Sequence, residues 1–138
     1  MDDDLERIAG EIVDAAVKLH IRAGPGLLES VYEKLLGNDL EGRGLVVERQ
    51  KWISTELDGC RFERAFRVDL LVNKQVVVEV KSVDTLVPAH WKQVLTYLRL
   101  MNLRLGFLIN FKEAKLKDGL KRVVNRYDGF AGSRLRVR

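Results

Sequence analysis

The sequence predicts an α/β fold in which helices flank a mixed central sheet. In the first 40 residues, apolar side chains recur at spacings of three and four, which is typical of amphipathic helices. Strand-like patterns follow between residues 45 and 82. An amphipathic segment at 88–101 then separates two apolar segments, which is the arrangement of a helical crossover between parallel strands. The predicted order is α, α, β, β, β, α, β, α.

Two helices are expected at the N-terminus. The first should end before Gly24, and its apolar face is formed by Leu5, Ile8, Ile12, Val13, Ala16, Val17 and Ile21. Gly24-Pro25-Gly26 interrupts this pattern, and a second helix is expected over 26–40 because the fixed φ of Pro25 suits a helix entry. Its predicted core positions are Leu28, Val31, Leu35 and Leu36, and Gly42 and Gly44 should close it.

Short turns separate three expected strands. Asp58-Gly59 lies between segments 45–57 and 61–72, a turn signal that favours an antiparallel hairpin. Asn73-Lys74 makes a second tight turn into QVVVEVKS, whose valines indicate a central strand buried on both faces. Segment 105–111 is expected to lie parallel to this strand because a helix connects them.

The chain has a basic C-terminal part. Residues 1–98 contain 13 Lys and Arg against 17 Asp and Glu, a net −4, whereas residues 99–138 contain 11 against 3, a net +8. We expect a basic helix over 115–127 within a single domain of residues 1–130, and a loose basic tail over 131–138. Such a segment suits a polyanion, and a solvated helix is the alternative. The candidate nucleic-acid-binding residues are Lys115, Lys117, Lys121, Arg122 and Arg126.

Composition excludes several kinds of site. One cysteine, Cys60, and two histidines exclude an intrachain disulfide framework and a zinc site made of Cys and His alone. A metal would therefore be held mostly by oxygen. No apolar segment approaches the roughly 20 residues of a membrane span, and no signal peptide is visible, so a cytoplasmic protein without a membrane partner is expected.

The strongest chemical signal is Glu79-Val80-Lys81 in the valine-rich strand. Strand alternation places Glu79 and Lys81 on one face, and the Asn73-Lys74 hairpin would bring Asp69 close to Glu79. Neighbouring carboxylates repel unless a cation lies between them, and Mg²⁺ prefers such oxygen ligands. The alternative is a structural ion pair of Glu79 and Lys81.

Two helices could add side chains to this site. Glu29 and Tyr32 are three residues apart on the second expected helix, and Gln93 and Tyr97 are four apart on the crossover helix, with His90 on the same side. Simpler interpretations remain open: the tyrosines as core aromatics, Gln93 as a surface amide, and His90 as a group bonded near the helix N-terminus. Trp52 and Trp91 could stack on bases or lie in the core or at its rim.

The sequence resembles a known family. GLLESVY at 26–32 has the pattern that names the GxxExxY proteins, which are similar to the PD-(D/E)XK nuclease superfamily. The resemblance continues through VDLLV, VVVEVKS, AHWKQVLTYL, LGFLINF and LKDGLKRVV. It implies a restriction-endonuclease-like core of order α-β-β-β-α-β with a mixed sheet.

The resemblance also implies residue roles. Asp69 and Glu79 correspond to the two metal-binding acids of the superfamily, and Lys81 to its catalytic lysine. Val68 stands where the superfamily name has a proline, a departure that leaves the metal role of Asp69 open.

Helical residues correspond to accessory elements of the superfamily. Glu29 matches the assisting acid of many members. Gln93 and Tyr97 match the QxxxY element of the exonuclease-like branch, which helps to position the site or the DNA. The resemblance therefore implies six catalytic-site residues when these three are added to the two acids and the lysine.

The leading hypothesis is a Mg²⁺-dependent nuclease, with Mn²⁺ as an alternative ion, that hydrolyses DNA in repair, recombination or defence. The Val80 carbonyl would join Asp69, Glu79 and Glu29 around the metal. One competing hypothesis is a non-catalytic module that keeps the nuclease fold and binds nucleic acid or protein. Another is a homodimeric, structure-selective endonuclease.

Overall fold

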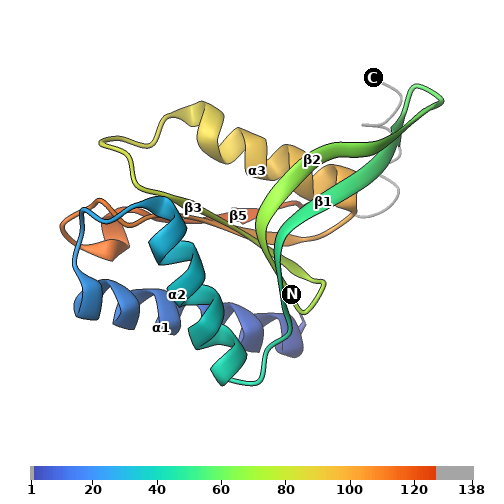
Figure 1. The fold of residues 1–138 in the computed structure, drawn as a ribbon. Coiled ribbons are helices and arrows are strands. Elements are labelled where there is room, and N and C mark those ends of the chain that lie inside the picture. Colours follow the sequence, from blue (N-terminus) through green and yellow to red (C-terminus); the bar gives the residue numbers. More distant parts are fainter. Residues whose placement is uncertain (1, 127–138) are drawn as a thin grey trace.

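A computed structural model describes residues 2–126, which form a five-stranded sheet. Helices lie on both faces of the sheet (Figure 1). In chain order the elements are α1 (Asp3–Ala23), α2 (Glu29–Gly42), β1 (Val47–Leu57), β2 (Cys60–Val72), β3 (Val76–Lys81), α3 (Pro88–Met101), β4 (Leu105–Asn110), the 3₁₀ turn η1 (Leu116–Asp118) and β5 (Leu120–Val124). The strand order is β1-β2-β3-β4-β5, and only β3 and β4 are parallel. The expected mixed sheet and α-β-β-β-α-β order are confirmed.

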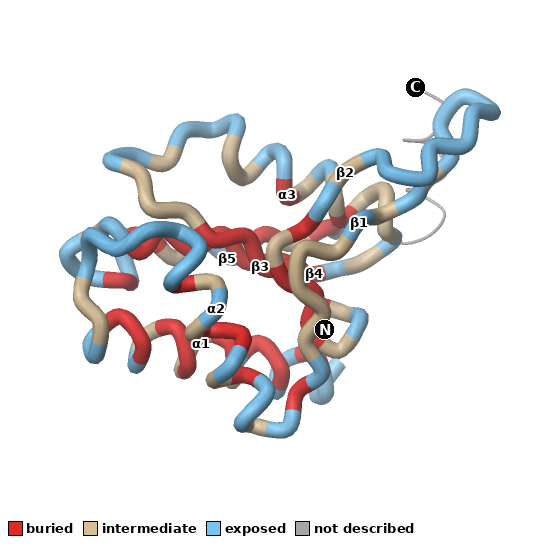
Figure 2. Tube along the Cα trace, in the orientation of Figure 1, coloured by how far each residue is buried: buried red, intermediate tan, exposed pale blue. Residues whose placement is uncertain are grey.

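Buried apolar residues form a core on each side of the sheet. Figure 2 marks the buried residues along the chain trace. Helices α1 and α2 cover the face that contains Val78 and Val80, whereas α3 covers the face that contains Val77 and Leu108. Strand β3 is buried on both faces, as its valines predicted. Gly106 permits close packing of α3, because a Cβ at this position would lie 2.9 Å from Val94 Cγ1.

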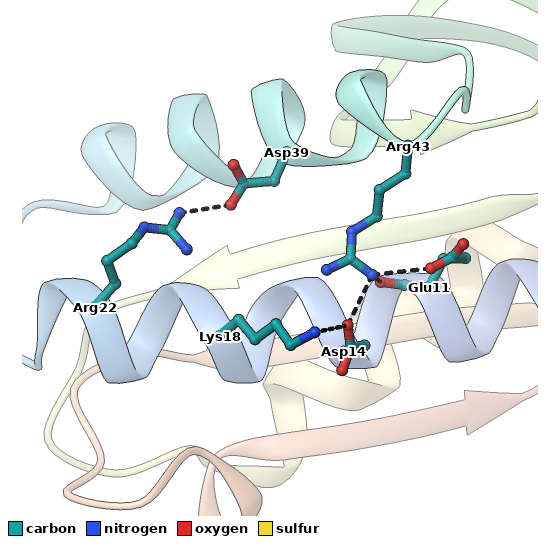
Figure 3. A network of polar contacts seen from close by, with 6 residues as sticks. All are labelled: Glu11, Asp14, Lys18, Arg22, Asp39 and Arg43. Carbon is teal, nitrogen blue, oxygen red and sulfur yellow. Dashed lines mark hydrogen bonds and ion pairs between the residues drawn. The ribbon is translucent and has the colours of Figure 1, made fainter.

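Ion pairs join the outer surfaces of α1 and α2 (Figure 3). Arg43, which follows α2, contacts Glu11 and Asp14 of α1 at 2.9 Å each, and Arg22 contacts Asp39 at 2.7 Å. These pairs are partly exposed and contribute little individually. They link the two helices that carry the N-terminal half of the core.

None of the helices within residues 2–126 is long and apolar enough to cross a membrane.

The second helix starts at Glu29, later than the expected residue 26. Gly24 and Gly26 have φ of 72° and 102°, and Leu28 is extended, so the chain turns before the helix begins. The expected core positions are partly wrong, because Leu28 is 73% exposed and Val31 is 38% exposed. Ile21, expected on the apolar face of the first helix, is 77% exposed.

Tyr32 occupies the core of this region. Its ring stacks on Phe111, with centroids 4.4 Å apart. Its hydroxyl donates to Gly24 O at 2.5 Å and accepts from Leu27 N at 3.0 Å. The core interpretation of Tyr32 is therefore correct, and its side chain fixes the turn that precedes α2.

The expected basic helix at 115–127 is wrong over the described residues. The structure has the turn η1 followed by β5, which pairs with β4 from Ile109↔Leu120 to Leu105↔Val124. The edge of β4 would otherwise expose unpaired backbone groups, and Gly119 opposes a continuous helix. A Cβ at Gly119 would lie 2.3 Å from Asn110 O, so glycine permits this close return of the chain. The tail expected at 131–138 lies outside the described residues.

The hairpin of β1 and β2 extends beyond the sheet (Figure 1). We call its outer residues 52–67 the arm; most of them are exposed (Figure 2). The expected turn is present, with positive φ at both Asp58 and Gly59. At the base of the arm, Gln50 has φ of 46°, which is unusual for a non-glycine residue. The arm therefore leaves the sheet next to Gln50.

Candidate functional site

The site lies where β2 and β3 separate. Their ladder ends at Leu70↔Val78, and continuing its register places Asp69 opposite Glu79. Each acid then bonds to the other strand: Asp69 N donates to Glu79 Oε2 at 2.6 Å, and Val80 N donates to Asp69 Oδ2 at 2.8 Å. The tight turn after Val72 thus brings the two carboxylates together, as the sequence predicted.

The two carboxyl groups occupy an environment that disfavours their charge. Burial, followed by the neighbouring Asp69, raises the pKa of Glu79 from 4.5 to about 8. Burial also raises the pKa of Asp69, against the opposing effect of its hydrogen bond from Val80 N. Glu79 therefore favours the protonated form, or a neighbouring cation, near neutral pH, and the pKa of Asp69 is shifted in the same direction.

Lys81 ends β3 on the same face as Glu79. No ion pair joins Lys81 to Asp69 or Glu79 within residues 2–126, although its charge opposes the rise in the pKa of both acids. A structural ion pair of Glu79 and Lys81 therefore does not explain the two charges. The ammonium group is close enough to act on the acids without neutralising either by direct contact.

The segment after Lys81 is held from two sides. Glu29 Oε2, at the start of α2, accepts from Ser82 N at 3.1 Å. Ser82 Oγ donates to Leu27 O at 2.9 Å. Buried Asn110 bonds to Val83 through both ends of its amide: Oδ1 accepts from Val83 N at 3.0 Å, and Nδ2 donates to Val83 O at 2.8 Å. Glu29 thus contacts the residue that directly follows β3.

Gln50 and Glu33 belong to the site, although sequence reasoning did not select them. Gln50 Nε2 lies 2.7 and 2.8 Å from the two oxygens of Glu33 and 3.3 Å from Asp69 Oδ1. The amide nitrogen must face these acids, because an amide oxygen cannot donate to a carboxylate. Burial raises the pKa of Glu33, and the charge of Arg67 is among the effects that oppose this rise. One signal could have indicated Gln50 as a site residue: the register of the β1–β2 hairpin places it opposite Asp69.

Helix α3 brings Tyr97 near the acids. Tyr97 stacks on Phe66 at 4.2 Å, and its pKa is raised by burial and then by Glu79 and Asp69. Gln93 lies one turn earlier and is exposed. His90 Nδ1 accepts from Val87 N at 3.0 Å, so this histidine fixes the start of α3. The structure therefore associates Tyr97 with the site, and His90 has the helix-end role that the sequence left open.

The basic C-terminal residues do not share one surface. Because β5 is a strand, its side chains alternate: Lys121 Nζ lies 4.3 Å from the Trp91 ring centroid on the α3 side, whereas Arg122 contacts Glu6 of α1 at 2.9 Å. Lys115 and Lys117 precede β5 at and within the turn η1, and Arg126 follows the strand. Strand β4 separates β5 from β3 and its catalytic candidates.

The donor set fits a hard divalent cation. Asp69 and Glu79 supply carboxylate oxygens, and Glu79 Oε1 accepts no hydrogen bond from the described residues. Val80 N–H points into the gap between the strands, and in an extended residue the carbonyl points to the same edge. Within residues 2–126, no group of three or more His, Cys, Asp and Glu side chains could hold a metal ion. Two carboxylates, a carbonyl and waters are nevertheless a common Mg²⁺ environment.

The fold and the paired acids define a nuclease-like protein. Residues 6–123 match the PD-(D/E)XK nuclease superfamily. The chain therefore belongs to this superfamily, whose nucleases generally use divalent metal ions.

A solved structure gives a second comparison. The crystal structure of a protein named SSO0001 is similar, with a TM-score of 0.54 and 20% sequence identity. The similarity covers 77% of this chain and 54% of that one, so this chain spans about half the length of its structural relative. At this identity the likeness concerns the fold alone. No curated protein matches the sequence.

Proposed function

We propose that this protein is a divalent-metal-dependent nuclease that hydrolyses phosphodiester bonds in DNA. The observation that carries the proposal is the pair of hydrogen bonds where β2 and β3 part, from Asp69 N to Glu79 and from Val80 N to Asp69, with Lys81 two residues beyond Glu79 on β3. GLLESVY at 26–32 supports the finer assignment to the GxxExxY proteins. Its Glu29 contacts the end of β3, and its Tyr32 fixes the preceding turn.

Oxygen atoms of the chain would hold the metal. Asp69, Glu79 and the Val80 carbonyl are hard ligands suited to Mg²⁺ or Mn²⁺, and Glu29 is a nearby fourth oxygen donor. When bound, the ion supplies charge stabilisation to a phosphoryl oxygen and lowers the pKa of a coordinated water.

Protein side chains would supply the remaining functions. Lys81 would orient the attacking water and oppose negative charge that develops during hydrolysis. Glu29 fixes the segment after Lys81 through Ser82 N. Gln93 and Tyr97, one turn apart on α3, would position the site or the strand.

The test is cleavage of single-stranded, duplex and branched DNA, and of RNA, with Mg²⁺ and with Mn²⁺. We expect metal-dependent cleavage that is lost in Lys81→Ala and Asp69→Ala while both variants keep a cooperative unfolding transition. Lys74→Ala is a matched control, because Lys74 is a lysine in the turn of the same hairpin, at the other end of β3. Absence of cleavage by the wild-type protein under all these conditions contradicts the proposal.

The same experiments address the competing functions. Salt-dependent DNA binding without cleavage, unchanged in Lys81→Ala, would identify a binding module. A dimeric endonuclease requires a dimer in gel filtration, and a strict monomer would contradict that arrangement.

A further inference from the structure

Trp52 is exposed on the arm although tryptophan is normally packed. Trp52 is 43% exposed. Two guanidinium groups lie near its ring, with Arg64 Cζ 5.1 Å and Arg67 Cζ 5.3 Å from the ring centroid. Trp52 and Arg67 are cross-strand partners, and Arg64 comes from the irregular part of β2 opposite Ser54. The arm therefore presents an aromatic ring flanked by two cations.

Neither of these two cations is engaged in a close ion pair within residues 2–126, although the charge of Arg67 acts on the Glu33 carboxyl group. Neither Arg64 nor Arg67 forms an ion pair there, whereas the neighbouring Arg61 is paired with Glu63 at 3.2 Å. Lys51, at the base of the arm, is paired with Glu48 at 2.9 Å. Positive charge at Arg64 and Arg67 is thus available to an external anion, and a guanidinium matches phosphate geometry well.

The position of this surface connects it to the carboxylate site. Phe66 packs on Tyr97 of α3, so strand alternation directs Arg67 and its partner Trp52 away from α3. Arg67 precedes Asp69 by two residues, a rise of roughly 7 Å along a strand. Trp52 follows Gln50 by two residues, and Gln50 contacts Asp69. Trp52 and Arg67 are therefore each two residues along their strand from a residue of the carboxylate site, Gln50 and Asp69 respectively.

We propose that Trp52, Arg64 and Arg67 bind an unpaired segment of the nucleic-acid strand next to the cleavage site, with a base stacked on Trp52 and phosphates on the arginines. This inference rests on the proposed nuclease function and adds a substrate class: single strands, or duplexes with frayed or single-stranded ends. Bases in an intact duplex are already stacked, so only an unpaired base can offer its face to the ring.

The experiment measures binding of a labelled single-stranded DNA oligonucleotide and of a blunt duplex containing the same sequence, with Ca²⁺ in place of Mg²⁺ to limit turnover. Loss of a stacking ring lowers affinity by roughly 5- to 100-fold. We expect Trp52→Ala to weaken single-strand binding in this range and duplex binding less than twofold. Trp52→Phe, which keeps an aromatic face, should restore most of the affinity.

The contribution of the two arginines is measured separately, through the salt dependence of the affinity. Arg64→Ala and Arg67→Ala should each reduce the slope of log affinity against log salt by about 0.7 for single strands. Arg61→Ala is the matched control, because this arginine lies on the same arm but is already paired with Glu63. Unfolding curves for each variant establish that the fold is retained.

Tryptophan fluorescence separates this inference from the nuclease proposal. In a Trp91→Phe protein the emission comes from Trp52 alone, and a stacked base should quench it. Quenching without cleavage of any substrate would refute the nuclease function and leave the binding surface established. Unchanged emission, equal loss of single-strand and duplex binding in Trp52→Ala, or binding of an acidic polypeptide in place of DNA would overturn the inference.

Discussion

Replacing Glu79 by glutamine tests whether the fold holds the two acids together against their electrostatic repulsion. Glu79 is 5% exposed and accepts a hydrogen bond from Asp69 N. The glutamine amide oxygen can accept the same bond, so the substitution removes the titrating group while keeping the size and main contact of the side chain.

The sign of the effect follows from the raised pKa. Burial and then Asp69 raise the pKa of Glu79 from 4.5 to about 8. A carboxyl group with a higher pKa in the folded state stabilises the fold fully below about pH 4.5, and this contribution is lost as the pH rises through about 8. At 1.36 kcal/mol per pKa unit, the ceiling is roughly 5 kcal/mol. Because Asp69 and Glu79 titrate as a pair, we expect the free energy of unfolding to fall by less than this ceiling, by about 2 kcal/mol.

Urea unfolding with EDTA at about pH 5 and about pH 9 measures this difference. We expect similar free energies of unfolding for the two proteins at the lower pH and a more stable Glu79→Gln variant at the higher pH. Saturating Mg²⁺ should stabilise the wild-type protein more at the higher pH, because it neutralises the ionised acids, and should stabilise the variant less. Glu63→Gln, an exposed change on the arm, is the control. The same pH dependence in wild type and Glu79→Gln would refute the reasoning.

Three further substitutions test the supports of the site. Asn110→Ala removes both hydrogen bonds to Val83 and should lower the free energy of unfolding by about 2 kcal/mol in urea titrations. Cleavage should also fall if the segment after Lys81 moves. Unchanged stability would contradict the role of this amide. Tyr32→Phe keeps the stack on Phe111 but loses two hydrogen bonds, and should cost about 1 kcal/mol by the same measurement. Gly119→Ala places a Cβ 2.3 Å from Asn110 O and should lower Tm by more than about 4 °C in thermal unfolding, whereas an unchanged Tm would show that β5 tolerates the shift.

The central part of the site was predictable because its information is local. A tight turn at Asn73-Lys74 and the period of two in β2 and β3 fix which residues face each other, and the ladder ending at Leu70↔Val78 brings Asp69 to Glu79. The valine-rich sequence of β3 likewise predicts burial on both faces. Both conclusions need only the spacing of residues within one hairpin.

Other parts depend on contacts between distant segments. Gln50 meets Glu33 of α2 from a position in β1 with positive φ, for which the sequence has no turn signal. The C-terminal segment looks helical by its charge and spacing, but pairing with the free edge of β4 stabilises a strand instead. Tertiary contacts thus overrode the local preference at that edge.

The distribution of charge shows most clearly how the fold differs from what the sequence suggested. The net +8 of residues 99–138 suggested one phosphate-binding surface, yet β5 directs Lys121 and Arg122 to opposite faces and lies two strands from Glu79. Two cations without an ion pair within residues 2–126, Arg64 and Arg67, instead lie on the arm, in the acidic part of the chain. Net charge sums over a segment without regard to direction, whereas phosphate binding requires cations that face the bound strand. If the arm binds the strand as proposed, Arg67→Ala should weaken single-strand binding more than Lys121→Ala.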